Sequence, residues 1–258
     1  TRRSFQSDIP KAHYRFIYQS VIAAKQQEIL LDILFEETPY PVLIQKPIDT
    51  EWIQQQGNAI LVNLPDVNAI TGDKLTAFAP NTIGIPYGLQ KEREIIKQLF
   101  DIGCLFDVID NTQTLKASFQ ALAEIEIAYR KIPISTEEVL EDIIQTGLVL
   151  AHREKQPNAA DTSKFKELSI GISQFNYFLF SGSFRIEEAQ TASAKAAYLA
   201  AIIKTNYEGE LHRFDPLMPL SSYLIQHPDF NFLNRKLKHV PNGALFYWYQ
   251  TLHLLSKA

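Results

Sequence analysis

Four residues of the sequence are candidates, from their local context, for binding a metal ion or a phosphate group. Asp32 stands inside the apolar run Ile29–Phe35, Lys74 lies in a mostly apolar segment, and Lys97 and Asp101 are four residues apart. A carboxylate among apolar residues is costly unless it is paired, hydrogen-bonded or bound to a metal ion. Asp32 is therefore the first candidate for a chemical role.

Each of these features also has a purely structural interpretation. Asp32 could be a buried carboxylate satisfied by hydrogen bonds, and Lys74 could extend its amine to water from a half-buried helix. Lys97 and Asp101 could form a solvated ion pair on one helix face, worth a few tenths of a kcal/mol. Taken singly, the structural interpretation is the commoner one. Taken together and in this order, the residues indicate something more specific.

The N-terminal part of the sequence has the pattern of strands. Over residues 14–19 an aromatic residue occupies every second position, which is the period of a strand. Ile29–Phe35 is apolar on both alternating faces, which predicts a strand covered on both sides. The polar stretch Lys25–Glu28 separates the two runs and predicts an antiparallel hairpin, and residues 59–64 predict a further short strand.

Helical patterns follow. Asp66 stands where a helix N-cap belongs, and Pro80 ends the helix that it begins. Beyond residue 111 the pattern is helical, with a capping box formed by Ser135 and Glu138. The other predicted helices cover 91–109, 115–130, 164–180, 186–207 and 244–255. The sequence therefore predicts an α+β fold, with a core at 1–110 and a helical domain at 111–258.

Composition excludes several classes of protein. The 258 residues carry a net charge of −4, so no overall basic charge favours nucleic acid, although a local basic patch remains open. Cys104 is the one cysteine, which rules out an internal disulfide and fits the cytoplasm. No apolar run approaches the length of a membrane span, so no membrane partner is expected. There is also no phosphate loop, dinucleotide fingerprint or zinc-ligand spacing.

The chain resembles the AbiEii/AbiGii family of nucleotidyltransferase toxins, a branch of the polymerase-β-like nucleotidyltransferase fold. The resemblance runs from about Tyr14 to Asp107 and more loosely through the helical part. It implies a mixed-sheet core, of which this chain holds the C-terminal part. It also implies Mg²⁺-dependent transfer of a nucleoside monophosphate from an NTP to an RNA or protein hydroxyl, and a cognate antitoxin as partner.

The resemblance assigns roles to individual residues. Asp32 matches the third carboxylate of the family's metal site and would be a metal ligand or general base. Lys74 matches the lysine that contacts the triphosphate. Asp101 matches the last aspartate of an Arg-Asp-x-x-Asp pattern near the active site. Lys97 stands in place of that arginine as a second nucleotide-binding residue, and Gln98 replaces the first aspartate.

One family motif is missing. The family has a Gly-Ser or Gly-Gly-Thr turn followed by an Asp-x-Asp strand, and in the nearest match here Pro10 stands at the second aspartate after Asp8. The first residue is Thr1 rather than Met, so these carboxylates either belong to a region upstream or are absent from a degenerate relative. The alternative to an enzyme is therefore a catalytically inactive nucleotidyltransferase-like scaffold that binds a protein or RNA partner. A structural helical module is a third, more distant alternative.

A basic cluster occurs near the C-terminus, formed by Arg235, Lys236, Lys238 and His239 beside two phenylalanines. In a toxin that modifies RNA, such a cluster could hold phosphates. A solvated helix face is the commoner explanation of such a run, and the sequence leaves both interpretations open.

Overall fold

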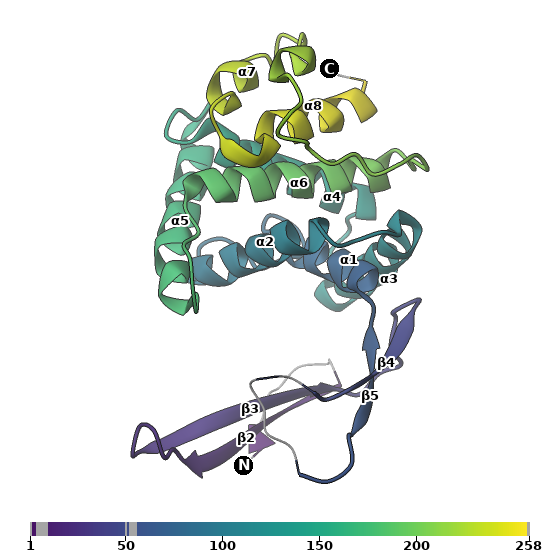
Figure 1. Cartoon of the computed structure of the whole chain (residues 1–258), viewed down its shortest axis with the longest axis vertical. Helices are drawn as coiled ribbons and strands as arrows, with labels where there is room; N and C mark the ends of the chain where they lie inside the picture. The colour runs from purple at the N-terminus through teal and green to yellow at the C-terminus, as the bar shows by residue number, and fades with distance from the viewer. Residues whose placement is uncertain (1, 4–9, 50, 52–55, 257–258) are drawn as a thin grey trace. The chain divides into compact units, whose positions relative to one another are not determined.

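The computed structural model describes residues 2–3, 10–49, 51 and 56–256. Asp8 and the turn-like residues around it therefore lie outside the described residues. The chain forms two compact units, Thr1–Pro39 and Tyr40–Ala258 (Figure 1). The described secondary structure contains both strands and helices, which confirms the α+β class.

The first unit contains the predicted hairpin. Strands β2 (Lys11–Gln19) and β3 (Gln26–Leu34) pair antiparallel, and β1 (Arg2–Arg3) adds a short third strand beside β2. Ser20 closes the turn by donating its backbone N–H to the carbonyl of Lys25 at 3.0 Å. The sequence therefore identified both long strands and their antiparallel pairing. Their connection lies earlier than predicted, because the turn covers residues 20–25 and the polar residues Gln26–Glu28 belong to β3.

The prediction that β3 is covered on both sides is wrong for this unit. Leu30 and Leu31, which point to opposite faces of the strand, are 54% and 45% exposed. The described part of the unit consists of strands and turns, so it holds no helix or second sheet that could cover either face. An apolar pattern indicates that burial of a strand face would be favourable, but it does not show that another element buries it.

The second unit begins with a separate small sheet. Strand β4 (Leu43–Pro47) pairs antiparallel with β5 (Leu61–Pro65), the strand predicted at 59–64. The sequence did not predict β4, because Pro39, Pro41 and Pro47 interrupt this segment and prolines, which cannot donate to a ladder, are rare inside strands. Every pairing among the described strands is antiparallel, so the mixed sheet that the family resemblance implied is not seen there.

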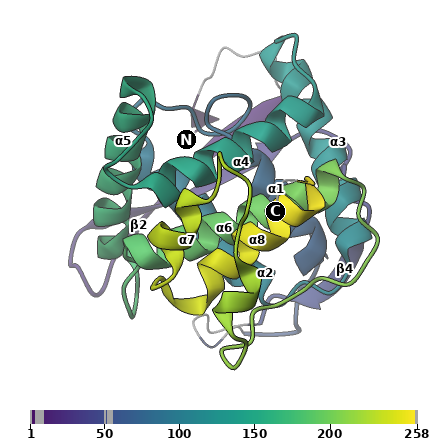
Figure 2. The same ribbon diagram turned by 90° about the horizontal axis from the view of Figure 1, so that it is seen from above.

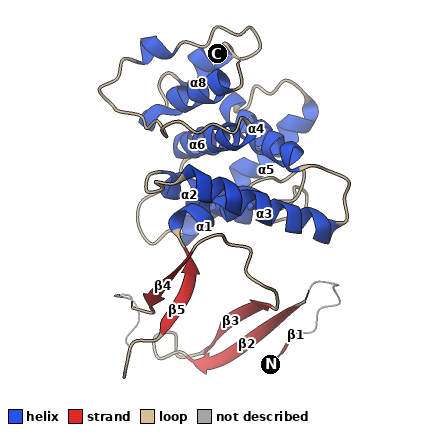
Figure 3. Ribbon diagram, turned by 90° about the vertical axis from the view of Figure 1, so that its right-hand side faces the viewer, coloured by secondary structure: helices blue, strands red, loops and turns tan. Residues whose placement is uncertain are grey.

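Strand β5 leads directly into helix α1 (Val67–Ala77), as Figure 3 shows. The Asp66 carboxylate accepts the backbone N–H of Ala69 at 2.7 Å, which confirms the predicted N-cap. The other helices of the unit are α2 (Glu92–Phe106), α3 (Thr112–Arg130), α4 (Thr136–His152), α5 (Ala159–Phe175), α6 (Ile186–Lys204), α7 (Phe232–Leu237) and α8 (Ala244–Leu254). Single 3-10 turns lie at Asn176–Phe178, Leu220–Tyr223 and Pro241–Gly243.

Helix α6 is the centre of the second unit. All of its residues from Ala189 to Ile203 are buried, and it packs against α2, α4 and α8 (Figure 2). A helix that is buried on all sides lies inside a core, and its polar residues such as Gln190 and Lys195 are buried with it. Its many alanines let neighbours approach closely: a Cβ on Gly103 of α2 would lie 2.9 Å from that of Ala192. Helices before and after residue 110 therefore share one core, and the division at residue 110 remains a prediction.

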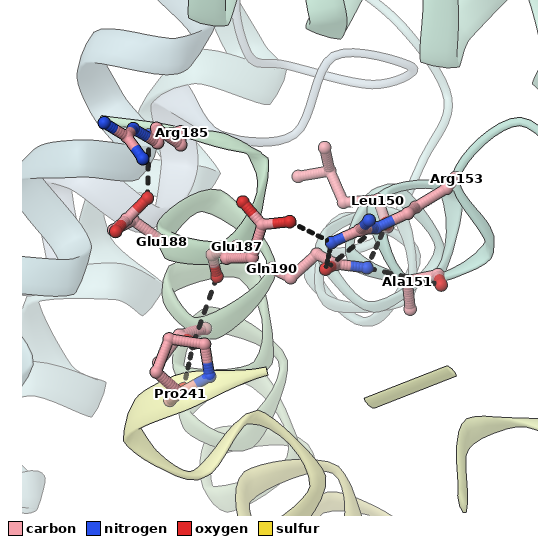
Figure 4. A network of polar contacts seen from close by, with 9 residues as sticks. Leu150, Ala151, Arg153, Arg185, Glu187, Glu188, Gln190 and Pro241 are labelled. Atoms are coloured by element: carbon pink, nitrogen blue, oxygen red, sulfur yellow. Dashed lines mark hydrogen bonds and ion pairs between the residues drawn. The ribbon is translucent and has the colours of Figure 1, made fainter. Parts of the chain in front are cut away.

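Polar contacts join the C-terminal end of α4 to α6 (Figure 4). The Arg153 guanidinium donates to Glu187 at 2.6 Å and to the side-chain oxygen of Gln190 at 2.8 Å. The Gln190 amide in turn donates to the carbonyl of Leu150 at 3.1 Å. Free carbonyls at a helix end require partners when buried, and this network supplies them from the neighbouring helix.

In the described part of the chain, no helix is both long enough and apolar enough to cross a membrane.

Candidate functional site

Helices α1 and α2 bring three of the predicted site residues together. Lys74 Nζ lies 3.0 Å from Asp101 Oδ2, and Lys97 Nζ lies 3.2 Å from the same oxygen. Lys74 also donates to the side-chain oxygen of Gln98 at 3.1 Å. The cluster of Lys74, Lys97, Gln98 and Asp101 is called the two-lysine cluster below.

Local helix geometry explains how these side chains meet. In α1 the buried face contains Thr71 and Leu75, and Lys74 stands beside that face in the last turn. In α2 the buried stripe includes Leu99, while Lys97 and Asp101 share the opposite face because they are four residues apart. The two helices pack against each other, so the flanking lysine of one reaches the polar face of the other.

The two-lysine cluster carries a surplus of positive charge. Two amines face one carboxylate, and the Lys74 and Asp101 side chains are only 24% and 26% exposed. Lys97 is more accessible, with 53% of its side chain exposed. An arrangement of partly buried amines that are not fully neutralised can bind an anionic group such as a phosphate.

Gln98 changes the chemistry that the family pattern would have at its position. Its side-chain oxygen accepts a hydrogen bond from Lys74, so it fills the acceptor position of the aspartate that it replaces. An amide oxygen has no net charge, however, and it neither neutralises an amine nor binds Mg²⁺ as strongly as a carboxylate does. The substitution therefore increases the positive charge of the cluster.

A second polar contact beside Lys74 was not predicted from the sequence. Tyr40 donates its hydroxyl to Asp73 Oδ2 at 2.9 Å. Burial, together with the nearby Asp73 carboxylate, raises the pKa of the Tyr40 hydroxyl above its ordinary value. The hydroxyl therefore stays protonated and holds Asp73 in place. Nothing in the local pattern around Tyr40 could have revealed this contact, because its partner is 33 residues away.

Asp32 belongs to the first unit, where it has an unpredicted partner. It stands directly opposite His13 in the β2–β3 ladder, and Asp32 Oδ1 lies 2.5 Å from His13 Nδ1. The carboxylate is 69% exposed, whereas the imidazole is 20% exposed. A ring nitrogen that donates to a carboxylate fixes the orientation of its oxygens. The apolar strand therefore does hold a hydrogen-bonded carboxylate, but an exposed one.

The described residues do not form a complete metal site. None of the groups that they form contains three or more His, Cys, Asp or Glu side chains placed to hold a metal ion. Asp32 is hydrogen-bonded to His13, and Asp101 is engaged by two lysine amines. Mg²⁺ is usually bound through one or two carboxylates together with phosphates and waters.

Asp142 of α4 is a buried carboxylate with a structural role. It accepts the backbone N–H of Asn81 and the hydroxyl of Thr82, each at 2.8 Å, and the hydroxyl of Thr146 at 3.2 Å. These contacts anchor the loop that connects α1 to α2. Asp142 was not predicted from the sequence, although its position on the apolar stripe of α4 was a signal.

Comparison with known proteins identifies the family. A family model described as nucleotidyl transferase AbiEii toxin, type IV toxin–antitoxin system, matches residues 2–220. No curated protein and no solved structure matched the chain. The family match extends from the hairpin through the two-lysine cluster to the central helix α6, well beyond the short motifs seen in the sequence. The chain therefore belongs to the AbiEii family of nucleotidyltransferase toxins of type IV toxin–antitoxin systems.

Proposed function

We propose that this protein transfers a nucleoside monophosphate from an NTP to a hydroxyl group of an RNA or protein acceptor, with Mg²⁺ as cofactor. The observation that supports this most directly is the two-lysine cluster, in which Lys74 and Lys97 lie within 3.2 Å of Asp101 Oδ2. Nucleotidyl transfer depends on neutralising phosphate charge and on positioning the reactants in line. Surplus amines on two packed helices suit the first requirement.

In this proposal Lys74 contacts the triphosphate and Lys97 assists from the more exposed side of the cluster. Asp101 holds both amines in place before the nucleotide arrives, so the cluster is organised in advance. A preorganised charge costs no rearrangement during the reaction, which is the main source of catalytic power in such sites. Asp101 is therefore proposed to act near the active site mainly by orienting the two amines.

Asp32 is proposed as a metal ligand or general base. Enzymes of this family generally use a divalent metal ion, and carboxylates supply its ligands. Among the described residues, Asp32 is held by His13. These two residues are not sufficient by themselves to hold the ion.

The acceptor is proposed to be RNA or a protein, and one surface of the second unit supports RNA. Lys236 of α7 donates to the carbonyl of His152 at the end of α4 at 2.6 Å. Burial, followed by repulsion from Lys155, lowers the pKa of Lys236; Glu154 opposes this shift, and Arg235 and Arg153 add to it. Cations from two segments, residues 153–155 and 235–236, thus repel one another on this surface. The phosphates of an RNA would relieve that repulsion. The proposed setting is the cytoplasm, with a cognate antitoxin as partner.

A catalytically inactive scaffold is the second candidate. It is favoured by the absence, within the described residues, of a carboxylate cluster able to hold a metal ion. In that case the two-lysine cluster would serve binding of an RNA or protein partner and no transfer would occur.

The test is incubation of the protein with Mg²⁺, each α-labelled NTP and a mixture of cellular RNA and protein. Transfer of label by the wild type, with loss of transfer in Asp32→Ala and Lys74→Ala, is the expected result. A wild type that transfers no label and does not differ from Asp32→Ala would contradict the enzymatic proposal.

Calorimetry separates the scaffold from the enzyme. An enzyme should bind NTP only with Mg²⁺ present, and Lys74→Ala should weaken that binding. A scaffold should show neither effect. Lys116→Ala, which removes a lysine of α3 outside the cluster, is a suitable control for the loss of one positive charge.

A further inference from the structure

The loop after α5 presents two aromatic rings to solvent. Tyr177 is 88% exposed and Phe178 is 65% exposed. The loop is nevertheless closed at its base, because the Asn176 side chain donates to the carbonyl of Phe184 at 2.8 Å and accepts its backbone N–H at 2.7 Å. Large aromatic side chains that a well-anchored loop leaves exposed are typical of a binding surface.

Contacts between α5 and α2 fix the position of this loop. A Cβ added to Gly171 of α5 would lie 2.4 Å from the carbonyl oxygen of Glu92, so the two helices meet there without space for a side chain. Gln174 donates to the Glu92 carboxylate at 3.3 Å. The ring of Phe175 lies 5.1 Å from that of Phe100, centroid to centroid. Tyr177 and Phe178 are therefore held beside the first turn of α2.

A hollow of about 310 Å³ lies between the loop and α2. It is lined by Gln90, Arg93, Glu94, Gln174, Tyr177 and Phe178. The Arg93 guanidinium lies over the Phe178 ring, with 4.3 Å from its Cζ to the ring centroid. Glu94 accepts a hydrogen bond from the same guanidinium at 2.5 Å, which holds its plane in position.

These side chains match the chemistry of a nucleobase. Aromatic rings and a guanidinium plane stack on flat bases, and the sequence-tolerant part of base binding comes from such stacking. Glutamine amides offer both donors and acceptors to the edge of a base. The hollow combines two rings, one guanidinium and the amides of Gln90 and Gln174, whereas an aliphatic ligand would use neither the planar charge nor the amides.

The hollow and the two-lysine cluster lie along the same face of α2. Arg93, Lys97 and Asp101 follow one another at intervals of four residues, so they form a single stripe along α2. At 1.5 Å per residue the stripe spans about 12 Å, which is comparable to the length of an extended nucleotide. A nucleotide whose phosphates lie at Lys97 and Lys74 can therefore reach the hollow with its base.

The geometry points to the Tyr177–Phe178–Arg93 hollow as the binding site for the base of the NTP substrate. This inference rests on the proposed nucleotidyltransferase function and assigns the part of the substrate that the two-lysine cluster leaves unbound. Phosphates are held by Lys74 and Lys97, the base stacks on Phe178 and Tyr177, and the glutamine amides face its edge.

The test compares two ligands by calorimetry in Mg²⁺ buffer: the NTP that binds best and inorganic tripolyphosphate, which has no base. Phe178→Ala and Tyr177→Ala should each weaken NTP binding about 10-fold, the loss expected for one stacked base. Both variants should bind tripolyphosphate as the wild type does. Phe180→Ala is the matched control, because Phe180 is an exposed ring of the same loop that does not line the hollow.

The remaining outcomes are decisive as well. Lys74→Ala should weaken binding of both ligands, which verifies that tripolyphosphate reports on the cluster. Wild-type affinity for NTP in both ring variants would overturn the inference and leave the proposed function intact. Equal losses for NTP and tripolyphosphate would also overturn it, since the rings would then act on the phosphate site. A wild-type protein that binds neither ligand would overturn the proposed function together with this inference.

Discussion

Lys74 Nζ lies 3.0 Å from Asp101 Oδ2 and thereby joins the last turn of α1 to the middle of α2. The pair is only about one quarter exposed, so its attraction is screened less by solvent than that of a surface ion pair. Lys97 reaches the same oxygen from a more exposed position. Because of this difference in exposure, we expect Lys74 to contribute more to catalysis than Lys97.

We expect Lys74→Met to lower kcat/KM for nucleotidyl transfer about 100-fold, the usual effect of losing one preorganised charge at a phosphoryl site. Lys97→Met should cost roughly 10-fold or less, because water already surrounds half of its side chain. Steady-state kinetics with labelled NTP measure both. Circular dichroism should show unchanged helix content, and a larger loss for Lys97→Met than for Lys74→Met would contradict the ranking.

The contact between His13 and Asp32 predicts an effect on the metal requirement. His13→Ala removes the group that lies 2.5 Å from the carboxylate and should weaken the apparent Mg²⁺ affinity about 10-fold, as the loss of a ligand's hydrogen-bond partner commonly does. Transfer rates measured over a range of Mg²⁺ concentrations check this. An unchanged Mg²⁺ dependence would show that the histidine does not orient a metal ligand, and His212→Ala provides a control histidine from the second unit.

Asp142 predicts a stability effect without a direct effect on catalysis. Asp142→Ala leaves the backbone N–H of Asn81 and the hydroxyls of Thr82 and Thr146 without their acceptor, and should lower the free energy of unfolding by about 3 kcal/mol. Asp142→Asn keeps an acceptor oxygen and should lose less. Urea unfolding measures both variants, and equal stability of wild type and alanine variant would disprove the anchoring role.

His152 predicts a dependence of stability on pH. Burial, followed by repulsion from Lys236, lowers the pKa of its imidazole in the folded state. The unfolded chain then takes up the proton first as the pH falls below about 6.5, so the free energy of unfolding decreases with acidity. His152→Gln should flatten the stability profile between pH 7 and pH 5. Urea unfolding across this range tests it, with the exposed His239→Gln as control.

Local sequence patterns predicted much of the secondary structure correctly. The alternation at Tyr14–Tyr18, the Asp66 cap and the Ser135–Glu138 capping box each correspond to an element that begins or ends where expected. These signals are local, because a strand period or a cap depends on residues a few positions apart. The helix predicted at 164–180 was displaced toward the C-terminus: α5 begins at Ala159 and ends at Phe175, beyond which the Asn176 side chain bonds across the loop to Phe184.

The sequence by itself also supplied the candidates Lys74, Lys97, Asp101 and Asp32, through motif order and family resemblance. Tertiary structure alone decided which of them meet. Lys74 bonds to Asp101 and Gln98 because α1 packs on α2, and His13 faces Asp32 because of the hairpin register. The exposure of Tyr177 and Phe178 likewise depends on the Asn176 contacts and on the close approach of Gly171 to Glu92. Such contacts join residues that are far apart in the chain, so no local pattern encodes them, and they form only when the helices pack.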